Sequence, residues 1–104
     1  MRQSVSRRDN RYAARLDVKL SATLREMGSS KRFDVQVEDL SLTGFRCTTA
    51  FRLNPGQVVA ITIPSLASLE ARVAWAEGYL YGCSFERALH VAVFDNLVSR
   101  FPKK

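Results

Sequence analysis

The feature that most constrains the fold is an alternation of apolar and polar residues with a period of two, repeated in short runs along the chain. A period of two is typical of a strand with one buried face, because successive side chains of a strand point to opposite faces of a sheet. The runs cover residues 16–24, 33–38, 45–51, 58–63, 69–75 and 79–85. Turn sequences separate them, such as Asn-Pro-Gly at residues 54–56. Short strands joined by tight turns predict an antiparallel barrel or sandwich.

The last part of the chain has a different period. Apolar residues recur three and four positions apart, at Val91, Phe94, Leu97, Val98 and Phe101. This spacing predicts an amphipathic helix over about residues 88–101, ended by the following proline. We expect its apolar stripe to plug or flank one end of the barrel. The fold class is therefore mainly β with a C-terminal α-helix.

Length and hydropathy place the chain among small single-domain proteins. It has 104 residues, which leaves little room for a second folding unit. No apolar run approaches the roughly 20 residues that a membrane-spanning helix needs. The charged N-terminus lacks the apolar segment of a secretory signal. We therefore expect no membrane insertion and a cytoplasmic location.

The charge of the chain is positive and unevenly distributed. The formal net charge is +6, and five arginines fall within the first fifteen residues. A basic balance of this kind favours an anionic partner: a nucleotide, a nucleic acid or a phospholipid surface. Residues 1–10 are rich in Arg and Ser and have no hydrophobic period, which predicts a flexible basic arm. The folded domain is expected to span residues 11–101.

The basic segment contains an R-x-x-x-R motif formed by Arg11 and Arg15, which lead directly into the first predicted strand. A guanidinium group is planar and always charged, and it binds phosphate or the O6/N7 edge of guanine through two hydrogen bonds. Two such groups four residues apart can grip one compact anion that carries both phosphate and guanine. The alternative interpretation, ordinary surface charges, stays open on this motif alone. Arg7 and Arg11 have the same spacing and form a competing pair.

A second motif, D-x-S-x-x-G, follows the second predicted strand and consists of Asp39, Ser41 and Gly44. A carboxylate can accept from a guanine N–H or cap its own turn, and a serine hydroxyl can donate to phosphate or bond the backbone locally. Glycine permits a positive φ or a close backbone approach. A local turn with a required glycine is thus the structural alternative to a ligand site.

The two motifs in this order resemble the ligand signature of the PilZ domain family. Val73-Ala-Trp75 and Tyr81-Gly-Cys-Ser-Phe85, followed by the helix, resemble the second half of that family. The resemblance covers about residues 7–101 and implies a six- or seven-stranded antiparallel β-barrel with a C-terminal α-helix. It also implies a non-enzymatic receptor for the bacterial second messenger cyclic di-GMP.

Carried over by position, the resemblance implies that Arg11 and Arg15 grip the guanine and phosphate groups of cyclic di-GMP. Asp39, Ser41 and Gly44 then line the other wall of the site. The family often has a further arginine where this chain has Asn10, with Arg7 and Arg8 farther back as possible additional contacts. One ligand or a stacked pair both remain compatible with this arrangement.

The expected mechanism is ordering of the basic arm around the ligand, which presents a new surface to an unidentified protein partner. Two alternatives remain. One is a small basic barrel that binds nucleic acid, which is disfavoured because the strands lack an evident exposed row of aromatic residues. The other is a PilZ-like interaction module that has lost its ligand.

The remaining reactive residues are given structural roles. Cys47 and Cys83 lie in strand-like runs and are interpreted as small core hydrophobes rather than a disulfide or redox pair. His90 at the helix start is interpreted as structural or solvated, and Trp75 as packing in the barrel. With one His and two Cys, the chain offers too few ligands for a zinc site, and we expect no metal, no catalytic residues and no cofactor besides the ligand.

Overall fold

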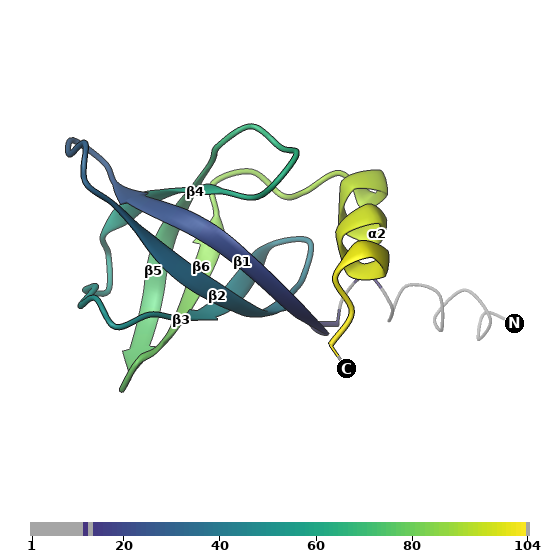
Figure 1. The fold of residues 1–104 in the computed structure, drawn as a ribbon, viewed down its shortest axis with the longest axis horizontal. Helices are drawn as coiled ribbons and strands as arrows, with labels where there is room; N and C mark the ends of the chain where they lie inside the picture. Colours follow the sequence, from purple (N-terminus) through teal and green to yellow (C-terminus); the bar gives the residue numbers. More distant parts are fainter. Residues whose placement is uncertain (1–11, 13, 104) are drawn as a thin grey trace, which may run out of the picture.

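The computed structural model describes residue 12 and residues 14–103, so the predicted flexible arm, residues 1–10, lies outside the described residues. Six antiparallel strands form a closed barrel in the order β1-β2-β3-β6-β5-β4 (Figure 1). The strands are β1 (Leu16–Glu26), β2 (Arg32–Leu40), β3 (Gly44–Thr48), β4 (Val58–Thr62), β5 (Leu69–Glu77) and β6 (Leu80–Phe85), and the helix is α2 (Val91–Arg100). The prediction of a mainly β barrel with a C-terminal helix is confirmed, with six strands.

The barrel follows from the alternation in the sequence. Along β1, Val18, Leu20 and Leu24 are almost completely buried, and the residues between them face outward or are half-buried. β4 closes the barrel by pairing with the second half of β1. Closure satisfies backbone hydrogen bonds that an open sheet would leave at its edges.

The third strand is shorter than the sequence suggests. It ends at Thr48, whereas the alternation predicted a strand through residue 51. The physical reason is local, because the hydroxyl of Thr49 donates to the carbonyl oxygen of Asp34 and accepts from the N–H of Phe51. Phe51 leaves the barrel wall, is 52% exposed, and stacks on Phe33 with ring centroids 4.6 Å apart.

The helix also begins later than expected, at Val91 rather than near residue 88. His90 caps it, since its Nδ1 accepts a hydrogen bond of 3.0 Å from the N–H of Ala92. This is a structural role, as the sequence suggested. Phe94 and Leu97 are buried in the barrel core, whereas Val91 is 40% exposed. The helix therefore covers one end of the barrel through the middle of its apolar stripe (Figure 1).

The chain beyond α2 returns to the barrel. The N–H of Lys19 donates to the carbonyl oxygen of Phe101 at 2.9 Å, and Pro102 forms an isolated bridge with Val18. This short contact lies beside the part of β1 that precedes its pairing with β4. Within residues 12 and 14–103, no helix is long and apolar enough to cross a membrane.

The two cysteines are free and buried, which confirms their interpretation as core residues. Cys47 lies on β3 and Cys83 on the adjacent β6, offset from each other by two residues in the register. The hydrogen bond with Cys83 raises the pKa of the Cys47 thiol above its ordinary value, and burial raises it further. Both effects favour the protonated thiol, which is the unreactive form.

We therefore predict that the folded protein resists thiol reagents. At pH 8, reaction of Cys47 and Cys83 with Ellman's reagent should be slower than in denaturant by more than about 100-fold, because access requires opening of the barrel. Absorbance of the released thiolate measures the rate. Rapid reaction of one thiol in the native protein would contradict this prediction.

Candidate ligand-binding site

The site is built around a bulge in β2. Val37 pairs with Cys47 and Asp39 pairs with Arg46, so Glu38 is an extra residue in β2 relative to β3. Such a bulge changes the phase of the alternation. It places Asp39 on the outer face of the barrel opposite Arg46, and the next residue returns to the core. Asp39 is therefore the second-last residue of β2, whereas the sequence placed it in the following turn.

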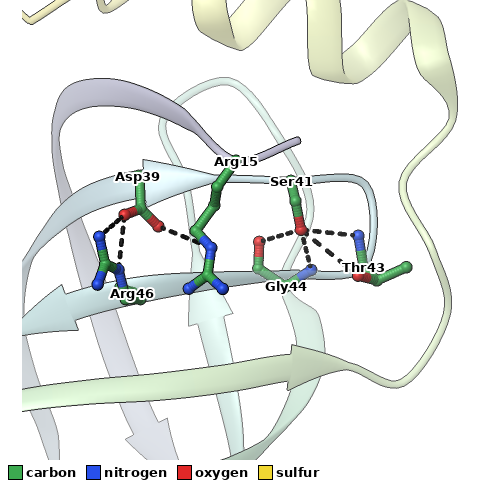
Figure 2. A network of polar contacts seen from close by, with 6 residues as sticks. All are labelled: Arg15, Asp39, Ser41, Thr43, Gly44 and Arg46. Atoms are coloured by element: carbon green, nitrogen blue, oxygen red, sulfur yellow. Dashed lines mark hydrogen bonds and ion pairs between the residues drawn. The ribbon is translucent and has the colours of Figure 1, made fainter. Parts of the chain in front are cut away.

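Two arginines surround the carboxylate of Asp39 (Figure 2). The Nε and Nη2 atoms of Arg46 both lie against Oδ2, at 2.6 and 2.5 Å. Arg15 approaches from the other side, with its Nε 3.8 Å from Oδ1. The Asp39 side chain is only 2% exposed, whereas those of Arg46 and Arg15 are 39% and 48% exposed. The carboxylate is thus buried beneath two basic side chains that reach solvent.

The two oxygens of this carboxylate are not equivalent. Oδ2 is fully engaged by Arg46, and Oδ1 has no hydrogen-bond donor among the described residues although it is buried. A buried acceptor without a donor is uncommon and often marks a site for a bound molecule. The hydrogen bond and charge of Asp39 raise the pKa of Arg46, and the nearby Asp17 and Glu38 contribute in the same direction.

Ser41 shapes the turn between β2 and β3. Its hydroxyl oxygen accepts from the backbone N–H groups of Thr43 at 3.2 Å and Gly44 at 3.1 Å, and it lies 3.3 Å from the carbonyl oxygen of Gly44 as a donor (Figure 2). The backbone N–H of Ser41 also donates to that carbonyl oxygen. Of the two roles open from the sequence, the structure shows the local one for Ser41.

Gly44 is required by a close backbone approach rather than by a positive φ. It lies opposite Ser84 in the register, and a Cβ atom at this position would collide with the carbonyl oxygen of Cys83. The residues with positive φ are elsewhere in the described chain. The glycine of the motif therefore lets β3 and β6 meet at the corner that carries Ser41.

A surface pocket of about 130 Å³ opens beside this corner. It is lined by Arg15, Ser41, Thr43, Gly44, Phe45, Ala74, Trp75, Gly82, Cys83 and Ser84. Trp75 is half-buried, and its indole covers Gly82, where a Cβ atom would collide with the ring. Trp75 thus lies on the barrel wall and borders the pocket, instead of packing only in the core.

The structure brings Arg15, Asp39, Ser41 and Gly44 together, as the sequence motifs predicted, but gives them unequal positions. Arg15 lines the pocket, whereas Asp39 does not and lies behind Arg15. Arg11, Arg7, Arg8 and Asn10 lie outside the described residues.

Sequence reasoning missed Arg46. The available signal was its place two residues after Gly44, on the polar side of a strand whose other side is apolar. Its pairing with Asp39 depends on the bulge, which the alternation did not reveal. No group of three or more His, Cys, Asp or Glu residues that could hold a metal ion is present in the described part of the chain.

The fold and the site define a small antiparallel barrel domain with a helix over one end and a polar pocket at the β2–β3 corner. The profile of the PilZ domain matches residues 6–99, and the chain belongs to the PilZ domain family. This family is known for receptors of cyclic di-GMP.

Among solved structures, the chain is similar to the PilZ domain of CeSA from a cellulose-synthesizing bacterium. The TM-score is 0.62 at 17% sequence identity, and the match covers 84% of this chain and 97% of that one. This likeness supports the fold. None of the curated proteins compared with the chain matches it.

The close contact at Gly44 gives a prediction about stability. Gly44→Ala should lower the free energy of unfolding by about 1–3 kcal/mol, because the new methyl group forces β3 away from β6. Urea denaturation followed by circular dichroism measures the change. The matched control is Ser84→Ala on the facing strand, an exposed position where a change within about 0.5 kcal/mol is expected. Equal stability of Gly44→Ala and the native protein would contradict the role of the close approach.

Proposed function

We propose that this protein is a non-enzymatic receptor for cyclic di-GMP. The observation that carries the proposal is the buried Oδ1 of Asp39, which has no hydrogen-bond donor among the described residues and lies beside an exposed arginine at the pocket. Guanine carries N–H donors on the edge that suits a carboxylate acceptor, and its opposite edge suits an arginine. Membership of the PilZ family supports the same ligand.

The chemistry of the corner assigns separate tasks to its residues. Asp39 accepts from the guanine N–H groups, and Arg15 binds phosphate or the O6/N7 edge through charge-assisted hydrogen bonds. Ser41 and Gly44 form the rigid wall against which the ligand packs. The indole of Trp75 offers an aromatic surface at the border of the same pocket, where a base can stack.

The proposed mechanism includes ordering of the basic N-terminal arm, with Arg11 as the second arginine of the grip. Tyr12 supports this geometry because its hydroxyl donates to Oδ2 of Asp95 at 3.2 Å and its ring contacts Phe94 edge-on. The chain next to Arg11 is thereby attached to α2, close to the start of β1. The ordered arm and the ligand then form a surface for a protein partner in the cytoplasm.

We predict that cyclic di-GMP binds and that Arg15→Ala weakens its affinity by roughly 10- to 100-fold, as expected for the loss of one or two charge-assisted hydrogen bonds. Isothermal titration calorimetry measures affinity and stoichiometry, and fluorescence of Trp75, the single tryptophan, reports on the pocket. Arg72→Ala is the matched control, since Arg72 is an exposed arginine that donates to the carbonyl oxygen of Gly56 outside the site.

Two other outcomes of the titration are informative. Absence of cyclic di-GMP binding together with salt-sensitive binding of a short oligonucleotide would replace the proposal with the nucleic-acid barrel, which the net charge of +6 favours. Absence of binding to both would leave a protein-interaction module.

The proposed ordering of the arm makes a separate prediction. Saturating cyclic di-GMP should slow amide hydrogen exchange in residues 7–15 relative to the free protein, because ligand contacts hold the backbone in one conformation. Exchange followed by mass spectrometry on overlapping peptides measures the protection, with the β4–β5 connection as an internal control. Tight binding without added protection in residues 7–15 would show that the ligand is held without the arm.

A further inference from the structure

Arg46 and Arg15 contact the same carboxylate in different ways, and the difference suggests different tasks. Arg46 places two nitrogens on Oδ2 within 2.6 Å, from the position directly opposite Asp39 on β3. Arg15 has a single contact of 3.8 Å to Oδ1, which is longer than a hydrogen bond. The first contact is part of the sheet, and the second is a loose ion pair at the pocket.

We propose that Arg46 is a positioning residue, the permanent counter-ion of Asp39, and that Arg15 is an exchangeable one. Arg46 holds the carboxylate by Oδ2 so that Oδ1 is directed away from β3 toward Arg15 (Figure 2). When a ligand donor reaches Oδ1, Arg15 leaves the carboxylate and turns to the anionic groups of the ligand. This inference rests on the proposed function for the identity of the ligand.

The need for a permanent counter-ion follows from burial. The side chain of Asp39 is 2% exposed, and a buried carboxylate that loses its only cationic partner is strongly destabilising. Arg15 can therefore leave Asp39 only if a second cation stays behind. Arg46 meets this requirement, since its contact to Oδ2 does not occupy the oxygen that the ligand uses.

The geometry of the pocket requires the exchange. Arg15 lines the pocket together with Ser41 and Gly44, whereas Asp39 does not line it. A molecule in the pocket meets the side chain of Arg15 before it reaches Oδ1. Because Arg15 is 48% exposed, it can rotate toward solvent without leaving a cavity in the core.

The first test needs no ligand and uses the melting temperatures of Arg15→Gln, Arg46→Gln and the double variant. Arg15→Gln alone should shift Tm by less than about 3 °C, and Arg46→Gln should lower it by roughly 5 °C or more. In the Arg46→Gln background, where Arg15 is the last counter-ion, Arg15→Gln should cost clearly more than in the native background. Additive shifts, or a larger effect of Arg15→Gln alone, would overturn the proposal.

Two further variants guard against misreading this test. Asp39→Asn combined with Arg46→Gln should be more stable than Arg46→Gln alone, because the uncompensated charge is gone. Arg25→Gln removes an equal charge from β1, where Arg25 donates to the carbonyl oxygen of Ser29, and should lack coupling to Arg15. Coupling between Arg25 and Arg15 would indicate a general effect of net charge instead.

The second test measures cyclic di-GMP binding by calorimetry in the same variants. Arg46→Gln should weaken binding by at least about 10-fold, Arg46→Lys should recover part of the loss, and Arg46→Gln should have little effect once Asp39 is Asn. An equal loss in the Asp39→Asn background would mean that Arg46 contacts the ligand itself, which would overturn its role as a positioning residue. If the native protein does not bind cyclic di-GMP, the proposed function fails, and the melting temperatures still decide which arginine is the permanent counter-ion.

Discussion

The bulge at Glu38 in β2 is the constraint on which the rest of the site depends. Without the extra residue, the strict alternation of β2 would carry Asp39 into the apolar core behind Val37. With it, Asp39 faces Arg46 on the outer side and Leu40 returns to the core against Phe45. One inserted residue thus separates the barrel interior from the polar corner and sets the direction of the carboxylate.

The sequence predicted the fold well because most of the chain obeys one simple period. The alternation and the turn residues were sufficient for the strands, and the change of period at Val91 was sufficient for the helix. The errors lie where side chains compete with the backbone pattern. Thr49 ends β3 early through its hydroxyl, and His90 starts α2 late by capping it. Such contacts join residues that a period does not connect.

The site was predicted in its composition but not in its organisation. Arg15, Asp39, Ser41 and Gly44 were identified from two motifs, and all four meet at one corner. Their division of labour was not visible, because it depends on a bulge and on which oxygen each arginine touches. Arg46 carried no motif of its own, and only the register opposite Asp39 shows its importance. A sequence motif names the side chains, whereas the strand register decides which of them share a charge.

The attachment of Tyr12 to α2 has a consequence for how binding energy is divided. Between this anchor and the start of β1 at Leu16 the chain is short, so Arg15 is tethered beside the pocket. A ligand held by the β2–β3 corner therefore meets Arg15 at a high effective concentration and needs only a side-chain rotation. Any contact from residues before Tyr12 must instead offset the cost of ordering backbone. The affinity accordingly separates into a preorganised share from the corner and a conditional share from the arm, and sequence changes before Tyr12 can tune the second without disturbing the first.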